Sequence, residues 1–184
     1  IIILVTPNLH YNNPMKDHRI RIKQGKTMIK NSIFLISLLV ASRFIGLPGN
    51  FTPLLALAVF MPRLTNNKYI QCLFPISIIA FTNLFLEPVS LTIFIAMLII
   101  FAITPLISQL SKSLLPGYLS AILTWHIFVN GAVWLSSGGS LIQTYIAAIP
   151  FDFKLAVSTG LYIALFHYAD RILINLSAKE LVNE

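Results

Sequence analysis

Charged residues are scarce in this sequence. Asp, Glu, Lys and Arg make up 10% of its 184 residues, against about 25% in an ordinary soluble domain. Hydrophobic residues make up 57%, and the mean hydropathy is +0.82. So few charges cannot cover a surface that faces water, which excludes a soluble globular domain. We therefore predict an all-α integral membrane protein that forms one compact helical bundle.

Cysteine and the signatures of enzymes are also nearly absent. Cys72 is the single cysteine, so no disulfide can form within the chain. The sequence has no Gly-rich phosphate loop, no His-x-x-x-His pair, and no Ser or Cys nucleophile in a recognisable setting. We expect no enzymatic activity, no cofactor and no resident metal. Active transport would then need a partner's energy or an ion gradient.

Six apolar segments predict six membrane crossings, because a helix of about 20 residues spans the hydrocarbon core. The segments are Ile29–Leu47, Phe51–Met61, Tyr69–Leu86, Val89–Ile107, Gly117–Leu135 and Phe153–Ala169. The second covers only about 17 Å as a helix. It must be shielded by protein, re-enter the membrane, or be extended by an irregular segment that lines a cavity.

Prolines and glycines set the predicted breaks between and within these segments. Pro75 is expected as a tolerated kink, and the fourth helix is expected to lose its hydrogen bonds near Pro105. The fifth helix should stop at 136–140, where serine and glycine cluster. A separate apolar piece, Leu141–Phe151, is expected to close at Pro150.

The ends of the chain differ from its middle. We predict a basic N-terminal tail over 1–27, a six-helix membrane domain over 28–171 and a short tail over 172–184. Met28 would be a natural start for the membrane part, so the first segment is either a cytoplasmic tail or upstream sequence. Its apolar stretch precedes its basic run, the reverse of the order in a signal peptide.

Positive charge indicates the orientation. With six crossings and the N-terminus inside, the outer connections hold only Lys154, and the other lysines and arginines outside the spans fall on the cytoplasmic side. Both termini are then cytoplasmic. The net charge of +7 follows this topology without interleaved aromatic residues, so we expect no nucleic-acid partner. The basic tail is instead interpreted as an anchor to the lipid bilayer.

With this topology, most polar side chains of the membrane segments fall near the outer ends of the helices. His126, Asn130 and Trp134 recur at a spacing of four and share one face of an apolar helix. A polar stripe on such a helix faces another helix or a cavity, and we expect a pocket for an unknown small-molecule ligand. The predicted ligand-binding residues are Arg43, Asn50, Asn83, Glu87, His126, Asn130 and Trp134.

Each of these residues also has a purely structural interpretation. Arg43 within a span needs a partner; Glu87 and Asp152 lie at matching depth, and the pair would lock helix ends or form a rim that binds an ionised ligand. His126 would make an interhelical hydrogen bond, contact a ligand or, with further ligands at its depth, bind a metal. Trp134 would anchor the interface or stack on a planar ligand.

Several motifs resemble an uncharacterised family of bacterial putative membrane transport proteins. The stretches that resemble it are Arg43 followed by Pro48-Gly49-Asn50-Phe51-Thr52-Pro53 and Ala56-Leu57-Ala58, then residues 130–138 and 145–151. That family is similar to the substrate-capture (S) components of energy-coupling-factor transporters. The resemblance implies six helices, the bacterial cytoplasmic (inner) membrane, ligand capture from outside, and a transmembrane coupling subunit with ATPases as partner.

The chain departs from this pattern at two places. Asn83 stands where an aspartate is expected, and Met61-Pro62-Arg63 stands where small residues usually follow the short second helix. Ala56 and Ala58 remain the candidates for docking the coupling subunit. Two functions stay open: a subunit that binds or transports a small solute, or an accessory subunit that packs against a larger membrane complex.

Overall fold

The computed structural model describes residues 36–45, 51–86, 88–111 and 113–182, with the side chains of 170 and 173–182 excepted. Throughout these residues the fold is all-helical, with six helices and no strands. The helices are residues 36–44, α2 Leu54–Leu64, α3 Lys68–Asn83, α4 Leu91–Leu110, α5 Leu114–Ser137 and α6 Leu141–Val182. Three of them are long and apolar enough to cross a membrane: α4, α5 and the part of α6 over Leu141–Ala169.

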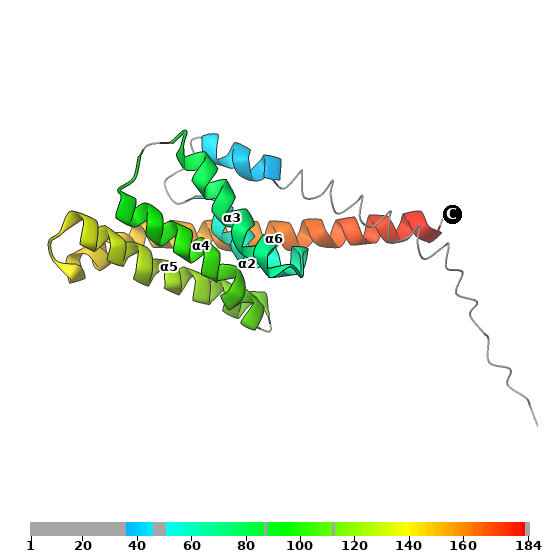
Figure 1. Ribbon diagram of the computed structural model, residues 1–184. Helices are drawn as coiled ribbons and strands as arrows, with labels where there is room; N and C mark the ends of the chain where they lie inside the picture. Colours follow the sequence, from blue (N-terminus) through cyan, green and yellow to red (C-terminus); the bar gives the residue numbers. More distant parts are fainter. Residues whose placement is uncertain (1–35, 46–50, 87, 112, 183–184) are drawn as a thin grey trace, which may run out of the picture.

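The connections between helices alternate between the two ends of the bundle (Figure 1). The turns α2–α3 and α4–α5 lie at one end, and the connections α3–α4 and α5–α6 lie at the other. Asn67 begins α3 by accepting hydrogen bonds from the amides of Tyr69 and Ile70. Gly138 ends α5 at a φ of 71°, and its N–H donates to the carbonyl of Trp134. The predicted stop over 136–140 is thus confirmed.

α2, only 11 residues long, is the centre of the bundle. α2 packs against α3, α4, α5 and α6, and each residue from Leu54 to Met61 is 3% exposed or less. Ser108 on α4 donates a hydrogen bond of 2.6 Å to the carbonyl of Val59. Of the three explanations offered for its short length, shielding by protein is therefore the correct one.

The burial of α2 changes the interpretation of its two alanines. Ala56 and Ala58 are both 0% exposed, so their side chains contact this chain's own helices. Docking a coupling subunit would require them at the surface, and this structure does not place them there. We therefore assign both to internal packing, where small side chains let neighbouring helices approach closely.

Proline interrupts the helices less than the sequence predicts. Pro75 lies inside α3 as expected. Pro105 lies inside α4, which continues to Leu110, and Pro150 lies inside α6, which runs unbroken from Leu141. The predicted boundary at Pro150 is wrong, because α6 continues through it to Val182. The predicted end of the sixth apolar segment at Ala169 coincides with the end of the span-like part of α6, Leu141–Ala169. A proline removes one backbone hydrogen bond, and packing of the rest of a long helix can outweigh that loss.

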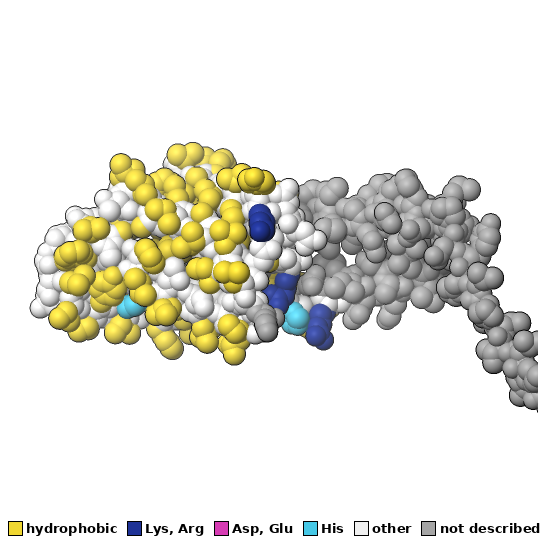
Figure 2. Space-filling view, turned by 60° about the horizontal axis from the view of Figure 1, so that its bottom comes forward, with side chains coloured by type: hydrophobic (Ala, Val, Ile, Leu, Met, Phe, Trp, Pro, Cys, Tyr) yellow, Lys and Arg dark blue, Asp and Glu magenta, His cyan; other side chains and the backbone are white. Residues whose placement is uncertain are grey.

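Large apolar side chains cover much of the described surface. Leu110, Leu84 and Ile142 are 86%, 78% and 70% exposed, and Figure 2 shows a face that is mostly hydrophobic. Lys and Arg side chains gather at one end of that face, toward the carboxyl end of α6. Soluble monomers rarely expose contiguous apolar patches larger than a few hundred Å². The apolar surface of this protein is therefore not typical of a soluble monomer.

Candidate functional site

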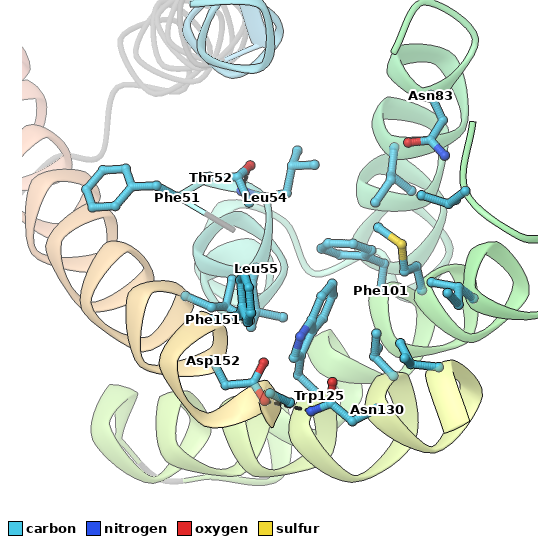
Figure 3. Close-up of a pocket in the computed structure, with 18 of the residues that line it drawn as sticks. Phe51, Thr52, Leu54, Leu55, Asn83, Phe101, Trp125, Asn130, Phe151 and Asp152 are labelled. Atoms are coloured by element: carbon cyan, nitrogen blue, oxygen red, sulfur yellow. Dashed lines mark hydrogen bonds between the residues drawn. The ribbon is translucent and has the colours of Figure 1, made fainter. Parts of the chain in front are cut away.

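A pocket of about 1020 Å³ lies between all six described helices. Its volume is at the upper end of the range for small-molecule sites. Figure 3 shows Asn83 on one side of it and Asp152 with Asn130 on another. The lining residues are Ser42, Arg43, Phe51, Thr52, Leu54, Leu55, Ile79, Asn83, Leu86, Val89, Ile93, Met97, Phe101, Trp125, Val129, Asn130, Val133, Ser137, Thr144, Ala147, Ala148, Phe151, Asp152 and Leu155.

Two polar clusters interrupt this apolar lining, and the first joins the helix over 36–44 to α3. Nη2 of Arg43 donates to Oδ1 of Asn83 at 3.1 Å. Nε of Arg43 is buried without a hydrogen-bond partner. Among the residues that the structure describes, no carboxylate pairs with this guanidinium. The cluster therefore presents a positive charge and spare N–H donors to the pocket.

The second cluster joins α5 to α6 through one carboxylate oxygen. Oδ2 of Asp152 lies 2.6 Å from Nδ1 of His126 and 2.6 Å from Nδ2 of Asn130. Asn130 Nδ2 is a donor, so it fixes Oδ2 as an acceptor. Nδ1 of His126 then carries a hydrogen and donates to Asp152, and its 3.2 Å approach to Asn130 is a contact between two donors. The carboxylate is thereby held by one amide and one imidazole.

Support from outside the pocket fixes His126 in this position. The ring of Tyr145 on α6 meets the imidazole edge-on, with centroids 5.3 Å apart. Its hydroxyl donates to the carbonyl of Ile127 at 2.6 Å. His126 does not line the pocket itself; it lies behind Asp152 and orients that carboxylate.

Aromatic side chains form the apolar part of the site. Phe101 and Trp125 both line the pocket, and their rings meet edge to face with centroids 6.1 Å apart. Phe51, which lies just before α2, and Phe151 on α6 complete this lining. An apolar or aromatic ligand body would be desolvated here, while the two polar clusters would fix its orientation.

The predicted ligand-binding residues divide into three groups. Arg43, Asn83 and Asn130 line the pocket. His126 does not, and its expected interhelical hydrogen bond is confirmed. Trp134 is also absent from the lining, and its Nε1 donates to the carbonyl of Gly139 at 3.1 Å. Asn50 and Glu87 lie outside the described residues.

The proposed pairing of Arg43 with Asp152 is wrong. Arg43 bonds to Asn83, while Asp152 bonds to His126 and Asn130. Matching depth along the membrane does not identify which helices are neighbours, and α5 packs directly against α6. Glu87, the other predicted partner, cannot be placed because it lies outside the described residues.

The stripe of α5 that lines the pocket differs from the predicted polar stripe. The pocket face of this helix carries Trp125, Val129, Val133 and Ser137, with Asn130 beside them. These four recur at a spacing of four, exactly one position before the stripe of His126, Asn130 and Trp134. Asn130 belongs to the predicted stripe and also follows Val129 of the pocket-lining stripe, so the sequence indicated that the two faces of the helix are adjacent.

A metal site finds no support in the described part of the chain. No three His, Cys, Asp or Glu residues gather there. His167, the other histidine considered, lies on α6 fifteen residues after Asp152, which is about 22 Å along a helix. His126 and His167 therefore serve no common site.

Comparison with known proteins identifies a family without assigning a function. A family model described as "Family of unknown function (DUF6580)" matches residues 23–178. The chain belongs to this family. No curated protein and no solved structure matches the chain. The match to DUF6580 covers all the pocket-lining residues, so the pocket lies within the part of the chain that defines the family.

Proposed function

We propose that this member of DUF6580 is an integral membrane protein that binds a small solute in the pocket, as a capture or transport subunit. The observation that carries the proposal is a pocket of about 1020 Å³ with apolar walls and two polar clusters. Solid packing between the same helices would instead have favoured an accessory subunit, with Arg43 and Asn130 acting as interhelical hydrogen bonds. A space of this size between polar side chains favours binding.

The surface supports the membrane part of the proposal. Three helices have the length and apolar composition of membrane spans, and large apolar side chains on α3 to α6 are exposed. Arg63, Lys68 and Arg171 are exposed, and Figure 2 shows Lys and Arg side chains gathered at one end of the apolar surface. Under the positive-inside rule that end is cytoplasmic. The pocket's polar residues Asn83 and Asn130 then lie toward the outer ends of α3 and α5.

In this proposal both termini are in the cytoplasm of a bacterium, and the protein lies in its cytoplasmic membrane. The resemblance to S components supports a coupling subunit with ATPases as partner. That partner would dock elsewhere than at Ala56 and Ala58, since both are buried.

Orientation is tested with single cysteines introduced into a Cys72→Ser background. Gln143 and Asn66 are exposed at opposite ends of the bundle. In intact cells, a membrane-impermeant maleimide should label Gln143→Cys and should label Asn66→Cys only after lysis. Labelling of both sites, or the reverse pattern, would contradict the proposed topology.

Solute binding is tested with a matched pair of substitutions on α5. Val133 lines the pocket, whereas Leu135 is 68% exposed on the same helix. The protein in nanodiscs is screened against a small-molecule library by thermal shift, and hits are repeated with Val133→Phe and Leu135→Phe. We expect Val133→Phe to weaken binding at least about tenfold by filling the site, and Leu135→Phe to leave it unchanged. Hits that respond equally to both variants, or no hits, would favour the accessory role.

A further inference from the structure

The pocket has two charged side chains, and the described residues satisfy the hydrogen bonds of one more fully than those of the other. Asp152 receives hydrogen bonds from Asn130 and His126. Among the described residues, Arg43 has one hydrogen bond, to the neutral amide of Asn83, and its buried Nε has no partner there. An ionised guanidinium away from bulk water is costly unless an anion or several acceptors meet it. The charge whose hydrogen bonding is incomplete among the described residues is therefore the positive one, on Arg43.

The geometry around Arg43 resembles an incomplete anion site. Because Oδ1 of Asn83 accepts from Arg43, the amide nitrogen of Asn83 remains as a donor beside the guanidinium. Figure 3 shows the amide of Asn83 directed into the space above Phe101. Two kinds of donor, the Nη groups of Arg43 and the amide nitrogen of Asn83, are thus available to one acceptor group, whereas Nε of Arg43 is buried away from the pocket space. Carboxylate, sulfonate and phosphate groups match such donors.

We infer that the ligand is an organic anion with an apolar body, whose negative group lies against Arg43 and Asn83. Its body packs on Phe101 and Trp125. The carboxylate of Asp152 lies on another wall of the pocket and repels a second negative group, so it favours a neutral or donating group at that end. The inference rests on the proposed function, because it names the class of solute that the same pocket takes.

Two dyes with nearly the same ring system separate the contribution of charge from that of the apolar body. The anionic dye is 8-anilinonaphthalene-1-sulfonate, and the uncharged dye is N-phenyl-1-naphthylamine, which lacks the sulfonate. Binding to the full chain in phosphatidylcholine nanodiscs is measured by energy transfer from tryptophan, with protein-free nanodiscs subtracted. We expect Arg43→Gln to weaken the binding of the anionic dye about tenfold or more. The same variant should weaken the binding of the uncharged dye less than about twofold.

A second variant tests the role of the positive charge while keeping Arg43. Asn83→Asp provides the guanidinium with a carboxylate and removes the neighbouring N–H donor, so it should also weaken only the anionic dye. The matched control is Lys154→Gln, because Lys154 is an exposed cation of α6 outside the pocket lining. That variant should change neither dye. Equal weakening of both dyes by Arg43→Gln and Asn83→Asp, or no weakening of the anionic dye, would overturn the inference.

Val133→Phe separates this inference from the proposed function. If it blocks neither dye, the pocket is not a binding site and the proposed function fails. If it blocks both while Arg43→Gln does not discriminate between them, only the anionic class fails. Nanodiscs with a minor fraction of phosphatidylglycerol identify the source of the anion. If the site takes a lipid headgroup, phosphatidylglycerol will compete with the anionic dye at Arg43. It will then weaken binding of that dye to the unsubstituted protein more than binding to Arg43→Gln. If the site takes a soluble anion, phosphatidylglycerol will change the binding of the dye to both proteins equally.

Discussion

The two polar clusters of the pocket each join a charged side chain to an asparagine, but they differ in how fully that charged side chain is hydrogen-bonded. At the junction of α5 and α6, Asp152 is 7% exposed and both of its described partners are donors. At the junction of the helix over 36–44 with α3, Arg43 has one amide acceptor and a donor without a partner. A satisfied buried network stabilises a fold, whereas an unsatisfied charge facing a cavity stabilises whatever binds there. The first cluster is therefore assigned mainly to structure and the second mainly to recognition.

The largest effect that separates the two clusters is expected at Asp152. Asp152→Ala removes the carboxylate that accepts hydrogen bonds from Asn130 and His126, so both of these donors lose their acceptor. We expect a loss of about 2–4 kcal/mol in the free energy of unfolding, kept below the sum of two buried bonds because the His126 side chain is 29% exposed. Unfolding in mixed detergent micelles, followed by tryptophan fluorescence, measures it.

Asp152→Asn is the control for this prediction, since it keeps one acceptor oxygen and the same volume. Its loss should be smaller than that of Asp152→Ala. Equal stability of Asp152→Ala and the unsubstituted protein would show that the α5–α6 cluster does not hold the helices together, and the assignment of the two clusters would then fail.

The same substitution applied to each cluster gives the next largest contrast. Asn130→Leu removes a charge-assisted donor to Asp152, and we expect a loss of about 1–2 kcal/mol. Asn83→Leu removes the only described acceptor of Arg43, but solvent in the pocket can replace it, so we expect a loss below about 1 kcal/mol. The two variants are compared in the same unfolding assay. A larger loss for Asn83→Leu would reverse the assignment.

The helical fold was largely predictable because apolar run length carries that information. The six predicted segments overlap the six helices. The length of α2, 11 residues, is too short to span lipid alone, and shielding by protein was one of three explanations that this length left open. Proline gave the main errors: Pro150 was expected to end a segment, but α6 passes through it. A proline's cost is local, whereas the helix is held by packing along its whole length.

The site was predictable by type of residue and not by pairing. Arg43, Asn83 and Asn130 were identified because polar side chains in apolar helices face the interior of a bundle. The partner of Asp152 was missed, since His126 lies 26 residues away and only the packing of α5 on α6 brings the two together. The aromatic wall was missed because Trp125 is one apolar residue among many in the sequence.

The smallest effect on stability is expected at Arg43, where the effect on binding is largest. Arg43→Met keeps a long side chain against the apolar wall and removes a charge that no described residue neutralises. We expect stability between unchanged and about 1 kcal/mol higher, because a well-packed apolar residue often replaces a buried charge without loss. A loss above about 2 kcal/mol would mean that the folded protein itself pairs this charge. The double variant Arg43→Met with Glu87→Gln would then recover part of that loss, whereas a recognition role predicts no recovery, since the guanidinium would stabilise the ligand and not the fold.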